Sequence, residues 1–471
     1  MHNQDNLPEL KKSTLTTKDI VFFVVAAAAP LGATVGATPV VFSAGGNSTP
    51  LIYLVAAIVL LFFAAGLATV NRYKTSAGGF ADIAKIGLGK HAGNAAAGVA
   101  VIAYICMLSG LYGQFSVMLS DMIKDLFGFE MKWQYITFIA LFLVAILGYR
   151  DINFSAKILG ILMIFEVLIL AIFDVSVFIK MGFSTFQLTN NSTSIPVNSG
   201  AIVALMFAMS CFVGFESTTI YGEEAKNPNK TIPLATYISV VIIGFFFIIT
   251  TYCLNAAYIG SDVSKAATND MVSFVFNANT QFVGEWSTSL MRVLVVTSIF
   301  AVLLSFHNAL CRYLFSLGRM SFLNKRLSLI HPKFNSPYVA GIALTITLAF
   351  IISIFIISHS DPINQLYMWM VGTGTLGVIL LQCLGAFAIA AYFIKINNKH
   401  GILGVTFPIL SGVFLLLITL YAFINFNLLS GSDAGVSKYL PWILIISGVA
   451  GLINGFIKGK SMDIEREPRS V

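Results

Sequence analysis

The sequence predicts an all-α membrane protein that crosses the bilayer about twelve times. Hydrophobic residues make up 57% of the 471 residues and charged residues only 10%, whereas soluble domains usually contain about 25% charged residues. Apolar runs of about 20 residues, the length of a helix that spans a bilayer, recur as far as residue 458. These runs do not alternate between apolar and polar residues, as the strands of a membrane barrel would.

The predicted transmembrane helices occupy nearly the whole chain and leave no room for a soluble catalytic domain. Their approximate limits are 19–44, 49–71, 93–123, 133–149, 154–180, 200–221, 234–259, 287–310, 338–357, 363–394, 404–427 and 439–458. The five cysteines fall in separate apolar runs and form no CxxC pair, which argues against a zinc or disulfide framework. We therefore expect no metal site.

The distribution of Lys and Arg predicts the orientation of the chain. Of the 28 Lys and Arg residues, 22 lie on one side of the predicted topology, five lie on the other, and Arg292 lies inside the span 287–310. Cytoplasmic segments are enriched in these residues, so we expect both termini in the cytoplasm and the chain in the plasma (inner) membrane. The net charge of +7 then reflects membrane topology, and we expect no nucleic-acid partner.

Two of the predicted helices are interrupted near their middle. The first contains Pro30, Gly32 and Pro39, and the sixth contains Gly214. Proline removes a helix donor and clashes with the preceding turn, while glycine tolerates unwound conformations. Paired interruptions five helices apart are typical of secondary transporters built from inverted repeats, whose binding site lies at the interruptions. The alternative is that these glycines and prolines only help the helices to pack.

Several stretches resemble the amino acid–polyamine–organocation superfamily of permeases. The sixth helix and the loop after it resemble that family in Gly214-Phe215-Glu216, Gly222-Glu223-Glu224-Ala225-Lys226-Asn227-Pro228 and Thr231-Ile232-Pro233. The eighth helix and its following loop resemble it in Asn308, Arg312, Gly318-Arg319, His331-Pro332 and Pro337. Gly32-Ala33-Thr34 stands where many members carry Gly-Ser-Gly.

This resemblance implies a five-plus-five inverted-repeat core of the LeuT type, followed by two further helices. It also implies alternating access around a site at the membrane midplane, where the interrupted helices 1 and 6 hold the substrate. The expected units are a cytoplasmic N-terminal tail (1–18), a first repeat of helices 1–5 (19–182), a second repeat of helices 6–10 (200–395), helices 11 and 12 (404–458) and a cytoplasmic C-terminal tail (459–471).

The interrupted helices supply the residues that we expect to bind an amino-acid substrate. Free backbone N–H groups in an unwound stretch after Pro30 would bind the carboxylate, and carbonyl oxygens at both breaks would bind the ammonium group. Phe212, beside the second break, is expected to cover the substrate, and packing is the alternative role for it. The predicted substrate-binding residues are Gly32, Ala33, Thr34, Val35, Gly36, Tyr104, Phe207, Cys211, Phe212, Gly214 and Phe215.

Ionisable side chains inside predicted spans cost about 2.5–3.5 kcal/mol on insertion scales and mark function by default. Glu166 lies near the middle of span 154–180, where some proton-coupled members of the family have a lysine. We expect Glu166 to couple transport to H+, with Na+ as the alternative ion. Ser298 and Ser305 share a face of the eighth span and are its expected helpers.

Three further charged groups have predicted roles. Glu216 is expected to gate the site, or else to accept backbone N–H groups at the second break. Arg292 is expected to extend toward the outer surface. Glu223 and Glu224 with Lys226 and Lys230 are expected to form a solvated ion-pair cluster, which is a candidate part of an inner gate.

Together these features predict a secondary active transporter that imports an amino acid by alternating access, coupled to H+. A polyamine or amine importer, an amino-acid/amine exchanger and a sodium-coupled symporter stay as alternatives. A channel should show a pore loop or rings of like charge, and an embedded enzyme should show a nucleophile–base or metal cluster; neither pattern is present. We expect no enzymatic activity and no cofactor. The expected partners are a small-molecule substrate and the bilayer, for either a monomer or a homodimer.

Overall fold

The computed structural model describes residues 15–73, 79–149, 152–182, 199–396, 401–427, 435 and 437–457. In the fifth predicted span, side chains are described from Ile164 onward. The predicted C-terminal tail and most of the predicted N-terminal tail lie outside these residues.

The first half of the chain forms the first five predicted spans. Its helices are α1 (Thr17–Ala28), α2 (Pro30–Gly36), α3 (Thr38–Gly45), η1 (Gly46–Ser48), α4 (Thr49–Tyr73), α5 (Gly79–Leu88), α6 (Lys90–Phe127), α7 (Trp133–Tyr149) and α8 (Ile152–Met181). Helices α1 to α3 together form the first predicted span, and α4, α6, α7 and α8 form the next four.

The second half of the chain forms the remaining predicted spans. Its helices are α10 (Ser199–Ser210), η3 (Phe215–Glu223), α11 (Pro228–Ala257), α12 (Val263–Asn269), α13 (Phe274–Phe282), α14 (Glu285–Arg319), η4 (Lys325–Ser328), α15 (Tyr338–Ile357), η5 (Pro362–Tyr367), α16 (Met368–Lys395), η6 (Gly401–Thr406), α17 (Phe407–Ile424), η7 (Ser437–Tyr439) and α19 (Leu440–Ile457). Helix α10 and the 3₁₀ helix η3 form the sixth span.

The predicted polytopic all-α fold is confirmed. Ten segments among the described residues are long and apolar enough to cross a membrane. The shorter apolar helix α7 and the 30-residue helix α8 occupy the fourth and fifth predicted spans. Three short helices, α5, α12 and α13, lie between the predicted spans. They are only 10, 7 and 9 residues long, so they lack an apolar run long enough to predict them.

The two predicted helix interruptions are also present. In the first helix, Ala29 adopts a left-handed conformation with φ 40° and ψ 74°, and Pro30 has no N–H to continue the ladder. A second interruption follows at Ala37, before Pro39 in the first turn of α3. In the sixth helix, α10 ends at Ser210 and Gly214 has φ 117°, a conformation that favours glycine.

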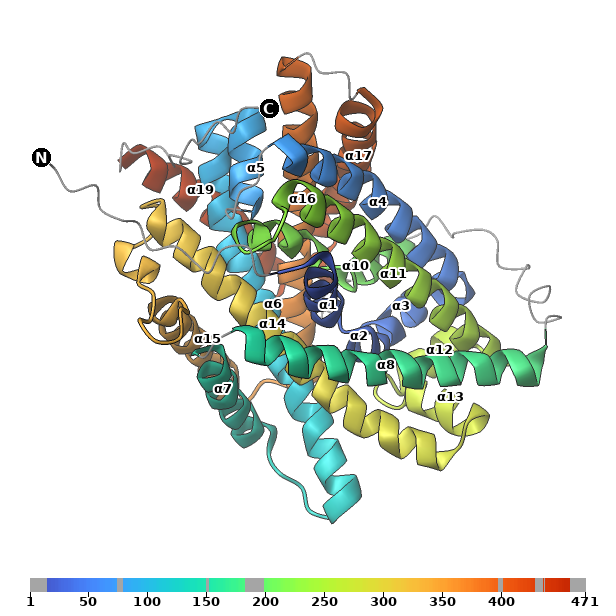
Figure 1. Cartoon of the computed structure of the whole chain (residues 1–471). Coiled ribbons are helices and arrows are strands. Elements are labelled where there is room, and N and C mark those ends of the chain that lie inside the picture. Colours follow the sequence, from blue (N-terminus) through green and yellow to red (C-terminus); the bar gives the residue numbers. More distant parts are fainter. Residues whose placement is uncertain are drawn as a thin grey trace, which may run out of the picture.

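The interrupted helices lie inside the bundle and the outer helices shield them from lipid. Figure 1 shows α2, α3 and α10 near the centre, with α15, α17 and α19 toward the outside. Of the apolar segments of these three outer helices, only 22%, 33% and 28% are buried. Helix α3 packs against α10, and α2 packs against both α8 and α14. Both breaks are therefore surrounded by protein.

Candidate functional site

A cavity of about 50 Å³ lies between the two helix interruptions. The first interrupted span lines it through Ala28, Ala29, Gly32, Ala33 and Ala37, and the second through Ser210, Cys211 and Val213. The remaining lining comes from α6, α14 and the start of the tenth span, through Met107, Leu111, Gln114, Ile299, Val302, Phe306, Tyr367 and Val371. The lining is mostly apolar, and no charged side chain contributes to it among the described residues. This cavity is the candidate substrate site.

The structure brings only part of the predicted substrate-binding set to this cavity. Gly32, Ala33 and Cys211 line it. The predicted residues that do not line it are Thr34, Val35, Gly36, Tyr104, Phe207, Phe212, Gly214 and Phe215. Phe212 is fully buried, and its ring packs on Phe247 at a centroid distance of 6.1 Å. Phe212 therefore packs inside the bundle, which was the alternative to covering the substrate.

The expectation of an unwound stretch after Pro30 is wrong. The chain re-enters a helix at Pro30, and the N–H of Ala33 donates to the carbonyl of Ala29 at 2.8 Å. The hydroxyl of Thr34 donates to the carbonyl of Pro30 at 2.6 Å. Proline fits the first helical turn because its missing N–H has no intrahelical partner there, so the interruption before α2 is confined to Ala29.

Glu166 and Ser298 hold the start of α2. The hydroxyl of Ser298 donates to Glu166 Oε2 at 2.6 Å and accepts the N–H of Gly32 at 3.2 Å. The backbone of Leu31 also hydrogen-bonds the Glu166 carboxylate. First-turn N–H groups lack intrahelical partners, so a carboxylate placed here satisfies them. The predicted pair of Glu166 and Ser298 therefore meets at the first break, and the N–H of Gly32, one of the donors expected to bind substrate, contacts Ser298 instead.

The second predicted helper, Ser305, is not part of this contact. Its hydroxyl has no hydrogen-bond partner among the described residues. It lines a second cavity of about 20 Å³, together with Tyr104, Tyr221 and Tyr313. Phe306 lines both this second cavity and the candidate substrate site. Phe306 therefore borders both cavities.

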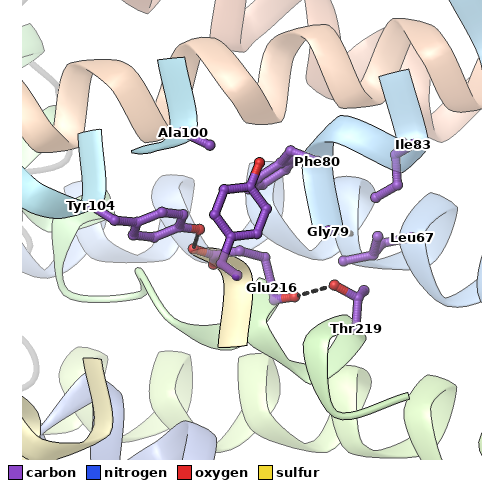
Figure 2. A pocket seen from close by; sticks show the side chains of 9 residues that line it. Leu67, Gly79, Phe80, Ile83, Ala100, Tyr104, Glu216 and Thr219 are labelled. Carbon is purple, nitrogen blue, oxygen red and sulfur yellow. Dashed lines mark hydrogen bonds between the residues drawn. The ribbon is translucent and has the colours of Figure 1, made fainter. Parts of the chain in front are cut away.

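Glu216 stabilises the second break. Its Oε1 accepts the hydroxyl of Tyr104 at 2.8 Å, and its Oε2 accepts the N–H of Gly214 at 3.1 Å. Figure 2 shows Glu216 between Tyr104 and Thr219, whose hydroxyl donates to the Glu216 carbonyl at 2.9 Å. A small cavity of about 10 Å³ adjoins this group. Glu216 thus accepts a backbone N–H group at the second break, which is the role predicted from the sequence as the alternative to gating.

Gln114 is a residue of the candidate site that sequence reasoning missed. It lies in α6, is 3% exposed, and lines the cavity. Its Nε2 donates to the carbonyl of Gly32 at 3.2 Å. The available signal was an amide in the middle of a long apolar span.

A buried ion pair closes the bundle beyond the second cavity. Arg312 Nε lies 2.9 Å from Glu224 Oε1, and the guanidinium lies over the ring of Tyr221. Tyr221 stacks on Phe23 of α1 at a centroid distance of 5.4 Å. The predicted solvated cluster is therefore wrong for Glu224: α14 continues to Arg319, which places Arg312 inside the bundle and within reach of Glu224.

The N-terminal segment joins this closure through its backbone. The N–H of Leu15 donates to the carbonyl of Glu224 at 3.0 Å, and the N–H of Lys226 donates to the carbonyl of Leu15 at 2.8 Å. Leu15, the loop after the sixth span and α14 are thus tied together.

Two further charged groups lie away from the cavity. Arg292 Nη1 is 2.8 Å from Asp125 Oδ2, and its guanidinium lies over the ring of Phe276. Asp174, which sequence reasoning missed, is 7% exposed and accepts the hydroxyl of Thr250 at 2.9 Å. Within the described residues, no group of three or more His, Cys, Asp or Glu side chains could hold a metal ion.

Comparison with known proteins gives several similar transporters. A branched-chain amino acid permease of Bacillus subtilis is 22% identical over 309 residues, which are 65% of this chain and 61% of the relative. A serine/threonine exchanger of the same organism is 27% identical over 40% of this chain and 41% of the relative. A cadaverine/lysine antiporter of Escherichia coli K12 is 26% identical over 23% of each chain. The chain spans less than two thirds of the length of each relative.

The family comparison covers much more of the sequence. The profile described as amino acid permease matches residues 15–451, which include both interruptions, the cavity between them and the buried ion pair. The match agrees with the resemblance first seen in the loop after the sixth helix, and it identifies a family of permeases and not of enzymes. The chain belongs to the amino acid permease family.

Proposed function

We propose that this protein is a secondary active transporter that imports a neutral amino acid across the plasma membrane, by alternating access and with H+ as the coupling ion. The observation that carries the proposal is a cavity between two helix interruptions, with a buried carboxylate bonded to one of them. A substrate in this cavity would contact both interrupted helices. Glu166 contacts the first of them through Ser298 and the backbone of Leu31.

The cavity lining supports a neutral substrate. A dibasic amino acid or a polyamine needs a facing carboxylate for each additional cation, because unpaired buried charge is costly. Glu166 and Glu216 are the buried acidic groups nearest the breaks, and each one already bonds a break. Among the relatives, the branched-chain amino acid permease and the serine/threonine exchanger act on neutral amino acids by name. The mostly apolar wall suits a small or aliphatic side chain.

The contacts of Glu166 support proton coupling. Its carboxylate links α8 to Ser298 of α14 and, through the backbone of Leu31, to α2. A proton on Glu166 removes the negative charge that attracts these donors, since charge-assisted hydrogen bonds are the stronger ones. Protonation would then loosen the first break from α8 and α14, and permit the rearrangement that alternating access needs. Sodium is the competing ligand for the same carboxylate.

Both termini are proposed to lie in the cytoplasm. The excess of Lys and Arg in one set of connections supports this orientation. Leu15 contacts the connection after the sixth span, and Asn454 donates to the carbonyl of Phe322 in the connection after the eighth. An even number of spans separates those two connections, so both ends of the described chain lie on the same side.

Reconstituted proteoliposomes test the proposal. Uptake of radiolabelled L-leucine, L-alanine and L-serine should require an inwardly directed proton gradient, with the outside more acidic, and should not depend on sodium. Glu166→Gln should still exchange internal for external substrate but should fail to accumulate it, and exposed Glu130→Gln is the matched control. Accumulation by Glu166→Gln at the wild-type level would remove Glu166 from coupling. Uptake driven by sodium alone would replace the proton with sodium.

A further inference from the structure

We infer that Gln114 is a substrate-binding residue, whose side-chain oxygen accepts a hydrogen bond from the ammonium group of the bound amino acid. This inference rests on the proposed transport function and assigns one recognition group within the same cavity. It comes from the orientation of one amide and from the occupancy of the polar groups around it.

The orientation of the Gln114 amide is fixed by the first interrupted helix. The carbonyl of Gly32 can only accept, so the Gln114 atom 3.2 Å from it must be the NH₂ group. Gly36 lies against the same NH₂ group, and a Cβ at this position would overlap it. The nitrogen end of the amide is therefore directed at the helix backbone. A larger residue at position 36 would displace the Gln114 amide from this position.

The Gln114 oxygen is available to accept a hydrogen bond from a ligand in the cavity. Gln114 lines the cavity, and its Oε1 makes no hydrogen bond within the part of the chain that the structure describes. Two other polar groups of the lining are already engaged, because Ser210 and Cys211 both donate to the carbonyl of Phe207, at 2.6 and 3.4 Å. A donor on a substrate in the cavity would give this oxygen a hydrogen-bond partner.

The chemistry of the amide selects the ammonium group of the substrate. An amide oxygen is an acceptor only, and an ammonium group is a donor only. Because the amide is neutral, it binds the ammonium group without adding a charge to the cavity, which suits a zwitterion. A 2-hydroxy acid has a neutral hydroxyl in place of the ammonium group and would gain less from the same acceptor.

Binding to purified full-length protein separates these contributions. The probes are three matched pairs, L-alanine with L-lactate, L-leucine with L-2-hydroxy-4-methylpentanoate, and L-serine with L-glycerate, titrated by calorimetry. In Gln114→Leu, the affinity for the preferred amino acid should fall about 10–100-fold, as expected for a lost hydrogen bond to a charged group. The affinity for its hydroxy-acid partner should change less than about 3-fold. Gln382→Leu, at a buried position outside the lining, is the control and should change neither.

A second variant protects the test against a simple folding defect. Gly36→Ala should displace the Gln114 amide and weaken amino-acid binding in the wild-type background. In a Gln114→Ala background, the same Gly36→Ala change should have little further effect, because the overlapping atoms are gone. Thermal unfolding of each variant in detergent shows whether the protein is folded.

The outcomes distinguish this inference from the function on which it rests. Wild-type protein that binds none of the amino acids contradicts the proposed function and this inference together. Wild-type binding that is unchanged in Gln114→Leu contradicts only the inference. An equal loss of amino acid and hydroxy acid in that variant also contradicts it, since a role for the ammonium group requires unequal losses. Two results together support the inference. Gln114→Leu should lose more affinity for the amino acid than for the hydroxy acid, and the effect of Gly36→Ala on binding should nearly vanish in the Gln114→Ala background.

Discussion

The buried ion pair between Arg312 and Glu224 should hold one side of the transporter closed. The pair joins α14 to the connection after the sixth span, and the stacked rings of Tyr221 and Phe23 bring α1 to the same point. Opening the second cavity toward that side would separate these groups. Glu224→Ala removes the acidic partner and leaves the arginine in place, so we expect it to destabilise the closed conformation selectively.

The size of the effect follows from burial. Arg312 and Glu224 are 8% and 4% exposed, and removal of one partner from a buried ion pair costs about 3–5 kcal/mol. The cost applies to the closed conformation, because water hydrates Arg312 once the path opens. The contact between the guanidinium and the Tyr221 ring persists and favours the lower end of that range. Since 1.4 kcal/mol is a tenfold change in an equilibrium constant, about 3 kcal/mol raises the open-to-closed ratio roughly 100-fold.

Cysteine labelling measures this ratio directly. The five native cysteines are replaced, and Ala309, which lines the second cavity, is changed to cysteine. Inside-out membrane vesicles are treated with a membrane-impermeant maleimide, and the labelling rate is followed with and without Glu224→Ala. Exposed Lys230→Ala, in the same part of the chain, is the control. We expect labelling to become roughly 100-fold faster in Glu224→Ala and unchanged in the control.

An unchanged labelling rate in well-folded Glu224→Ala protein would refute the reasoning. The pair would then be a static contact that is kept in both conformations. Faster labelling in Lys230→Ala as well would show that any change in this connection opens the path, which would also remove the special role of the buried pair.

Three further predictions concern the two breaks and the path between the cavities. Gly214→Ala should destabilise the protein by about 1–2 kcal/mol, because alanine is strained at φ 117°; unchanged thermal unfolding in detergent would contradict this. Phe306→Ala should join the two cavities and raise substrate efflux from loaded proteoliposomes without a pH gradient, and wild-type retention would speak against a barrier at Phe306. Tyr104→Phe should lose the hydrogen bond to Glu216 and lower stability by about 1.5–3 kcal/mol, which thermal unfolding with a Tyr135→Phe control on the exposed face of α7 can measure.

The membrane spans and the helix breaks were predictable because their signals are local. A transmembrane helix needs about 20 consecutive apolar residues, and proline and glycine act on the turns next to them. The same local view explains the error after Pro30, since a proline that ends one helix also fits the first turn of the next. Glycine at positions 32 and 36 was read as a sign of unwinding. The structure shows close packing at Gly36 instead.

The contacts within the candidate site were mostly not predictable, because they join distant parts of the chain. Gln114 lies 82 residues from Gly32, and Arg312 lies 88 residues from Glu224. Neither position has a local pattern that names its partner. Glu166 was singled out because an ionisable side chain inside a span marks function, and Ser298 was named as its helper in cation coupling, although 132 residues separate them. Buried polar groups also require partners, and this rule applied to Gln114 would have added it to the site.

Both breaks are held by side chains of other helices, and this arrangement suits a molecule that must change conformation. Glu166 of α8 and Gln114 of α6 bond the first break, and Tyr104 of α6 reaches the second through Glu216. Hydrogen bonds of this kind contribute about 0.5–3 kcal/mol each. A ligand can shift a conformational equilibrium only by its difference in affinity for the two states. Binding of a substrate or of a single proton can supply a free energy of this size. It cannot replace the extensive packing of α4 against α11. The interrupted helices are therefore the elements that we expect to move, against a scaffold that stays together.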